Sequence, residues 1–90
     1  MTITIQLTPQ DTLPSLLARL QAAADERVLF VVPSGLELTA VDLRALRREA
    51  AASGRGVALV TSDAGLRATA ENVGISTFRS RASRIRFSTW

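Results

Sequence analysis

The sequence predicts a small α/β domain built on a four-stranded parallel sheet. The first observation behind this prediction is the alternation of strand-like and helix-like segments, which gives the order βαβαβαβ with short connections. The second is the composition of the 90 residues, of which 47% are hydrophobic and 21% charged, as in ordinary globular proteins. We expect one α/β domain over residues 1–80, followed by an arginine-rich C-terminal tail over residues 81–90.

The N-terminal quarter predicts a strand and a helix. Between residues 2 and 7, apolar residues alternate with polar ones, which is the period-two pattern of a strand, and Pro9 ends the run. Asp11 or Thr12 then caps a helix that we expect to continue to about Ala24. Four leucines form one apolar stripe on this helix: Leu13, Leu16, Leu17 and Leu20.

The middle of the chain predicts a buried strand and a longer helix. Residues 28–32 form a continuous apolar run, which is typical of a strand covered on both faces, and residues 33–35 end it. Thr39 and Asp42 have the spacing of a capping box at the start of the helix. The glycines within residues 53–56 stop this helix, since glycine accepts the left-handed conformation at a helix end. We expect Val41, Leu43, Leu46 and Ala50 to face mostly inward. The residues expected to face mostly outward are Arg44, Arg47, Arg48 and Glu49.

The last third predicts another strand, helix and strand. Residues 57–61 form the third strand, and Ser62 or Asp63 caps a helix that continues to about Asn72. Residues 75–78 form a short final strand. No element is predicted over residues 79–90.

The order of the strands in the sheet is a separate prediction. We favour the order 2-1-3-4, a truncated flavodoxin-like winding, because it places helices on both faces and so gives three layers (α/β/α). This order explains why the second and third strands are apolar throughout. The alternating first strand argues against it, because a central strand should be apolar on both faces. The alternative is the order 1-2-3-4 with one sheet face covered by a partner.

Missing side chains restrict the chemistry. The chain has no His, Cys, Tyr or Lys, and all eleven basic residues are Arg. These absences remove an imidazole base, a thiolate, a Schiff-base lysine and a structural zinc site. Arginine stays protonated and cannot act as a general base. We therefore expect no enzymatic activity, no cofactor and no metal.

A crevice beyond the carboxyl ends of the strands is one candidate ligand site. In the order 2-1-3-4 it lies between the first and third strands, and a helix N-terminus there could hold an anion or nucleotide. The alternative, which we favour, is that Ser62 or Asp63 serves only as a helix cap. Ser34 and Gly35 follow the second strand, where turn formation explains them equally well. The predicted lining residues are Thr8, Gln10, Asp11, Thr61, Ser62, Asp63 and Gly65.

Charge is distributed unevenly along the chain. Residues 1–43 carry five acids and two arginines, a net charge of −3, whereas residues 44–90 carry nine arginines and three acids, a net charge of +6. This asymmetry predicts an anionic partner near the C-terminal end, which could be nucleic acid, anionic lipid or an acidic protein. A solvated tail is the alternative. The candidate residues are Arg79, Arg81, Arg84, Arg86 and Trp90.

Several segments from residue 30 onward carry a resemblance to a known module. They are residues 31–35, 41–48 and 57–63, followed by Leu66, Arg67, Ala70, Gly74, Ile75, Phe78, Arg79, Ser80 and Ala82. Over about two thirds of the chain they resemble an uncharacterised Rossmann-like module at the N-terminus of some larger bacterial envelope or baseplate-J-like proteins. A basic stretch and a membrane segment often follow that module. The resemblance implies that the arginine-rich end lies at a cytoplasmic membrane face.

Residues 28–78 also resemble the second half of a STAS domain, the anti-sigma-factor antagonist family. That family carries a phosphorylatable serine in an Asp-Ser-Ser-Gly motif before its first helix. Residues 38–41 stand at this place, the motif is absent from them, and Thr39 is their one hydroxyl. The helix expected over residues 13–24 also falls where the family has strands. The resemblance therefore does not extend to phosphorylation.

Together these observations predict a non-enzymatic interaction or regulatory module that works in the cytoplasm, at the inner face of the membrane if the first resemblance holds. A protein partner is the first expectation, and a homodimer is open. The alternatives are a domain that senses a small anion or nucleotide, and a domain that binds nucleic acid or an anionic membrane surface through its arginine-rich end.

Overall fold

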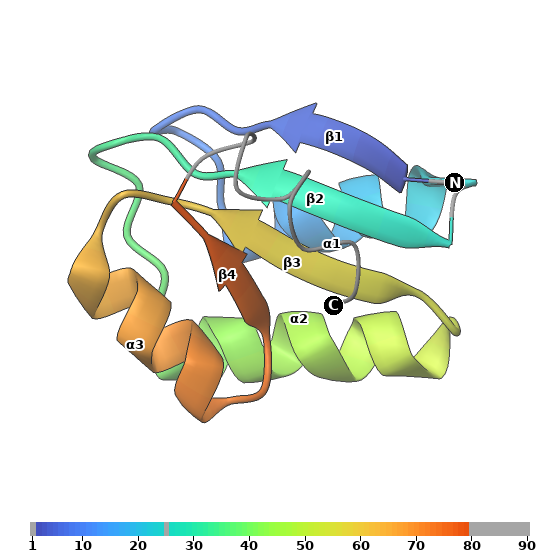
Figure 1. The fold of residues 1–90 in the computed structure, drawn as a ribbon. Helices are drawn as coiled ribbons and strands as arrows, with labels where there is room; N and C mark the ends of the chain where they lie inside the picture. The colour runs from blue at the N-terminus through green and yellow to red at the C-terminus, as the bar shows by residue number, and fades with distance from the viewer. Residues whose placement is uncertain (1, 25, 80–90) are drawn as a thin grey trace.

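The computed structural model describes residues 2–24 and 26–79, which form a four-stranded parallel sheet and three helices (Figure 1). The expected βαβαβαβ order is confirmed. The elements are β1 (Thr2–Gln6), α1 (Leu13–Ala22), β2 (Arg27–Val31), α2 (Ala40–Ala52), β3 (Gly56–Val60), α3 (Ala64–Asn72) and β4 (Ser76–Phe78). The predicted tail, residues 81–90, lies outside the described residues.

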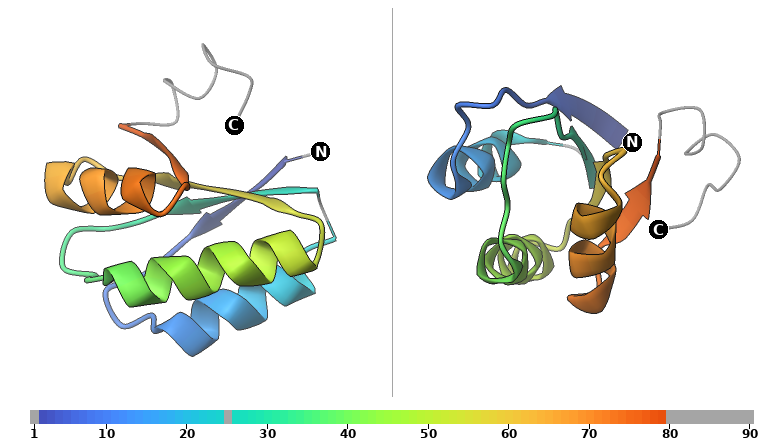
Figure 2. Two further views of the ribbon diagram at one scale, coloured as in Figure 1. Left: turned by 90° about the horizontal axis from the view of Figure 1, so that it is seen from below. Right: turned by 90° about the vertical axis from the view of Figure 1, so that its left-hand side faces the viewer.

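The strands lie in the order β1-β2-β3-β4, so the predicted order 2-1-3-4 is wrong and the alternative order is confirmed. Ile5 pairs with Phe30 and Phe30 with Leu59, which places β2 between β1 and β3. When each right-handed crossover leads to the adjacent strand in the same direction, all crossover helices lie on one face. Figure 2 shows all three helices on one side of the sheet. The predicted three layers are therefore two.

The exposed residues of β1 agree with its place at an edge. Thr4 and Gln6 are exposed, whereas Ile3 and Ile5 pack against the core. An edge strand that is covered on one face needs apolar residues only at every second position. The alternation that argued against a central first strand was therefore the informative signal.

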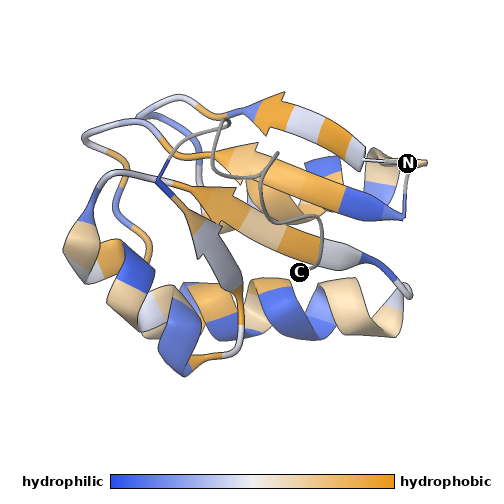
Figure 3. Cartoon of the chain, in the orientation of Figure 1, coloured by the Kyte–Doolittle hydropathy of each residue, from blue (hydrophilic) through white to orange (hydrophobic). Residues whose placement is uncertain are grey.

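The main core lies between the sheet and the helices. Leu16 and Leu20 of α1 and Leu43 and Leu46 of α2 are fully buried there. They pack in one cluster with alternate strand residues such as Phe30. Figure 3 shows apolar residues running along β2 and β3.

The helix-free face of the sheet carries a second, smaller apolar cluster. Leu29, Ala58, Val60 and Phe78 are buried in it, and Val31 packs against them. Leu29 and Ala58 expose no surface. No helix of residues 2–24 and 26–79 covers this face, and the expectation that a partner covers it stays a prediction.

Local signals fix the ends of α2. The Thr39 hydroxyl accepts a hydrogen bond from the Asp42 N–H, and the Asp42 carboxylate accepts one from the Thr39 N–H, so the predicted capping box is confirmed. Gly54 follows the helix with a φ of +69°, the left-handed conformation expected of a glycine at that place. Of the helices in residues 2–24 and 26–79, none is long and apolar enough to cross a bilayer.

We predict that the inward and outward residues of α2 differ sharply in their effect on stability. Leu46→Ala removes a fully buried side chain and should lower the free energy of unfolding by about 2–5 kcal/mol. Val41 was predicted to face inward, but it lies in the first turn of α2 and is 69% exposed. Val41→Ala should therefore change the free energy of unfolding by less than about 0.5 kcal/mol. Urea denaturation measures both, and similar losses from the two variants would contradict the placement of α2.

Candidate functional site

The predicted crevice between the first and third strands does not form as expected. β2 separates β1 from β3, so the loop that carries Thr8, Gln10 and Asp11 does not follow a strand next to β3. A hollow of about 170 Å³ instead lies beyond the carboxyl ends of β2 and β3. Its lining joins the two other sequence candidates, the turn after β2 and the start of α3: Val32, Pro33, Ser34, Gly35, Leu36, Thr61, Ser62, Asp63 and Leu66.

The polar groups at the start of α3 are already bonded to one another. The Asp63 carboxylate accepts hydrogen bonds from the N–H groups of Gly65 at 2.9 Å and Leu66 at 3.3 Å, which makes Asp63 the cap of the helix. The buried Thr61 hydroxyl accepts one from the Asp63 N–H at 3.1 Å. The carboxylate of Asp63 therefore fills the place that an anion would take at this helix N-terminus, and its negative charge repels one.

Asp11 belongs to a separate network that fastens the loop between β1 and α1. Its carboxylate accepts hydrogen bonds from the Thr8 N–H at 2.7 Å and the Ser15 hydroxyl at 2.9 Å. The Arg19 guanidinium lies 3.4 Å from the same carboxylate and also donates a hydrogen bond to the Gln6 carbonyl. The Thr8 N–H lowers the pKa of Asp11 most, followed among the lowering groups by Ser15 and Arg19, while burial partly offsets them. Asp11 is therefore not a helix cap or a free ligand group but a structural one.

The other predicted site residues are dispersed. Gln10 and Ser62 are exposed, and Arg79 is exposed just after β4. The remaining predicted members of the anionic-partner surface, Arg81, Arg84, Arg86 and Trp90, lie outside the described residues. That surface stays a prediction.

A different group of arginines gathers on α2 and on the loop after it. Arg44, Arg47 and Arg48 are exposed on the outer side of α2, and Arg55 follows the helix. We call these four residues the arginine surface. The helical spacing indicated that the first three point outward, but it did not indicate what they face. The structure places Arg47 beside the C-terminal end of α3, and the other three line hollows that reach Val73 or Gly74 there.

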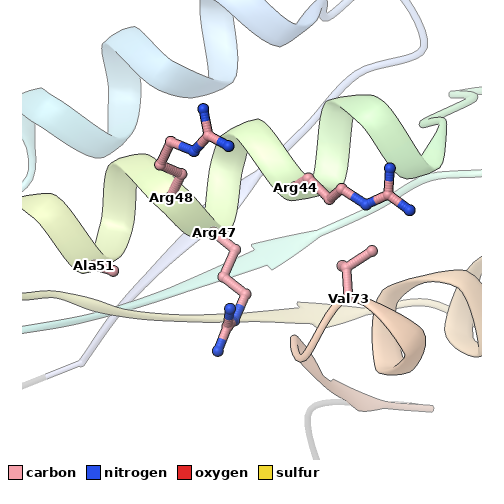
Figure 4. Close-up of a pocket in the computed structure, with 5 residues that line it drawn as sticks. All are labelled: Arg44, Arg47, Arg48, Ala51 and Val73. Carbon is pink, nitrogen blue, oxygen red and sulfur yellow. The ribbon is translucent and has the colours of Figure 1, made fainter.

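Two adjacent hollows accompany the arginine surface. The larger, of about 490 Å³, is lined by Arg44, Arg47, Arg48, Ala51 and Val73. Figure 4 shows the three arginines leaving α2 in different directions, with Val73 at the end of α3 pointing toward α2. The smaller, of about 240 Å³, is lined by Arg47, Ala50, Ala51, Arg55, Gly56, Val57, Gly74 and Ser76. Arg47 and Ala51 border both hollows, so the two form one continuous surface.

The guanidinium groups of the arginine surface have no anionic partner among residues 2–24 and 26–79. None of the four forms an ion pair or a side-chain hydrogen bond there. The two acids of α2 are held elsewhere: Asp42 in the capping box, and Glu49 by a hydrogen bond of 2.9 Å from Gln21 on α1. The positive charge on this side of the molecule is therefore not neutralised within the described part of the chain.

Metal ligation finds no support in the described residues, which contain no cluster of three or more acids, histidines or cysteines. Comparison of the chain with protein-family models, with curated proteins and with solved structures gave no match. The two resemblances drawn from the sequence therefore stay predictions. What the structure itself defines is a Rossmann-like α/β fold with a parallel sheet.

We predict that Asp11 contributes to the acid sensitivity of the fold. A carboxyl whose pKa is lower in the folded state than its ordinary value of 3.8 stabilises the fold above that value, and this stabilisation is lost as the pH falls through the lowered pKa. Asp11→Asn should therefore flatten the decline of the free energy of unfolding below about pH 4.

Urea denaturation of this variant between about pH 2 and pH 6 gives the comparison. Glu37→Gln is the matched control, because the Glu37 side chain is exposed and forms no hydrogen bond or ion pair in the described structure. An unchanged acid profile in Asp11→Asn, or an equal change in Glu37→Gln, would contradict the prediction.

We further predict that Asp63 is a structural cap and Ser62 is not. Asp63→Ala removes the acceptor of two backbone hydrogen bonds and should cost about 0.5–2 kcal/mol, whereas Asp63→Asn should retain most of the stability. Ser62→Ala should change stability by less than about 0.5 kcal/mol. Thermal and urea denaturation measure these effects, and an equal cost at both positions would show that the cap is misassigned.

Proposed function

We propose that the protein is a non-enzymatic interaction module whose working surface is the outer side of α2. The observation that carries this proposal is the arginine surface, which combines two adjacent hollows with four guanidinium groups that have no partner among the described residues. Unneutralised charge on one face of a small domain attracts a partner of opposite charge and raises its rate of association. Arg44, Arg47 and Arg48 also lie on a regular helix, so the positions of their Cα atoms relative to one another are fixed.

The state of the remaining polar groups supports a role without catalysis. Asp11, Ser15, Thr61 and Asp63 are among the residues that carry hydroxyl or carboxylate groups near the carboxyl edge of the sheet. Each is engaged in a hydrogen bond that holds a loop or begins a helix. A general base or nucleophile must instead be directed at a substrate.

The alternatives have less support in the described residues. A small-anion or nucleotide sensor would use the hollow beside α3, where the Asp63 carboxylate opposes an anion. Binding of nucleic acid or of a membrane through the C-terminal arginines depends chiefly on residues outside the described part. A place in the cytoplasm fits the absence of cysteine from the sequence.

Site-specific photocrosslinking in the cells that make the protein tests the proposal. A photoreactive amino acid at Val41, which lies on α2 with 69% of its surface exposed, should give one dominant protein adduct. The same amino acid at Ala22, exposed at the end of α1, is the control and should give none. An excess of the unmodified protein should suppress the adduct at Val41.

The outcome that would contradict the proposal is equally specific. Adducts of equal yield from Val41 and Ala22, or an adduct that excess unmodified protein does not reduce, would show that α2 is not a specific interaction surface. The absence of any adduct at Val41 under all growth conditions would also count against it.

A further inference from the structure

We infer that the arginine surface binds an acidic protein segment in which an apolar side chain lies between carboxylates. This inference rests on the proposed function and names its partner. It combines the charge of the surface, the apolar residues between the charges and the position of Arg47 beside the end of α3.

The backbone spacing of Arg44 and Arg48 matches that of carboxylate-bearing residues on a peptide. The two residues are about one helical turn apart, so their Cα atoms differ by a rise of about 6 Å along α2. Acidic side chains four residues apart on a helix repeat at the same distance, and those two residues apart on an extended segment repeat at about 6.6 Å. Guanidinium groups bind carboxylates through two parallel hydrogen bonds, so the geometry of each contact is defined.

The surface between the arginines is apolar. Ala51 and the half-buried Val73 line the larger hollow, and Ala50 and Val57 line the smaller one. Val41 lies three residues before Arg44 on the same helix and is the most exposed large apolar side chain of the described residues. A partner that buries an aliphatic side chain against this apolar surface gains binding free energy. A phosphate ion would not use it.

Nucleic acid fits this surface less well than a protein segment. Proteins that bind single strands stack the bases on aromatic side chains along a basic groove. No aromatic residue lines either hollow of the arginine surface. The combination of arginine with small aliphatic residues instead favours carboxylates interleaved with an aliphatic group.

The Arg47 side chain extends from α2 toward the C-terminal end of α3. Gly74 has a φ of +89°, and a Cβ at that residue would lie 2.8 Å from the Arg47 Nε. The absence of a side chain at Gly74 therefore lets Arg47 lie directly against the backbone that follows α3. The C-terminal end of a helix carries partial negative charge, which favours a guanidinium there. The exposed Arg47 side chain lies between the two hollows, where it is accessible to a partner.

A defined peptide tests the inference on the complete chain. The probe is a 12-residue synthetic peptide with a repeating Glu-Leu-Glu-Glu sequence, and its binding is followed by NMR shifts of the backbone and arginine side-chain N–H groups. We expect saturable shifts, concentrated at Arg44, Arg47, Arg48, Ala51 and Val73. A peptide with Gln in place of Glu, and a second with Ser in place of Leu, should each bind at least fivefold more weakly.

A matched pair of charge reversals provides the control. Arg44→Glu should weaken binding of the peptide about tenfold. Arg67→Glu makes the same change of charge at a half-buried arginine of α3 that lines neither hollow, and should weaken binding less than twofold. The dispersion of the NMR spectra verifies that both variants fold.

Several results would overturn the inference. Equal weakening by the two charge reversals would show that binding depends on the net charge of the protein and not on this surface. Equal binding of the Leu and Ser peptides would show that the apolar side chain makes no contribution. Tighter binding of inorganic phosphate, a single-stranded DNA oligomer or vesicles of anionic lipid would assign the surface to another class of partner. If the Val41 crosslink persists while the acidic peptide fails to bind, the interaction module stands and only its acidic partner is excluded.

Discussion

The parallel pairing of β2 with β3 determines where every helix of this protein lies. Val28 pairs with Val57 and Phe30 with Leu59, so the second crossover leads to the adjacent strand, as do the first and third. With right-handed crossovers, this arrangement places all three helices on one face of the sheet. Helix α2 then packs against both α1 and α3. Its inner side carries Leu43 and Leu46 into the core, and its outer side is left to solvent.

The sequence predicted the elements better than their arrangement. Apolar periodicity and caps are local, so the capping box of Thr39 and Asp42 and the stop at Gly54 were readable in advance. The neighbours of a strand depend on tertiary packing, and the continuous apolar runs of the middle strands fit either order. The alternation in residues 2–7 held the deciding information, because it is the pattern of an edge strand with one covered face.

The candidate site was predictable only in part, for the same reason. Helical spacing showed that Arg44, Arg47 and Arg48 face outward. It could not show that Val73 and Arg55, which come from other segments, complete the surface around them. The loop residues that the sequence favoured as ligands prove to be structural, since Asp11 fastens one loop and Asp63 caps one helix. Short polar side chains at helix starts are therefore a weak guide to ligands unless their hydrogen bonds are known.

The strand order is the central claim, because the exposure of the outer side of α2 follows from it. NMR scalar couplings across hydrogen bonds test it directly, since they identify which carbonyl accepts from each N–H. The structure predicts couplings from the Leu7 N–H to the Val31 carbonyl, from Val32 to Val60, and from Thr61 to Phe78. A coupling from the Leu7 N–H to a carbonyl of β3, or the absence of the coupling between Val32 and Val60, would contradict this account.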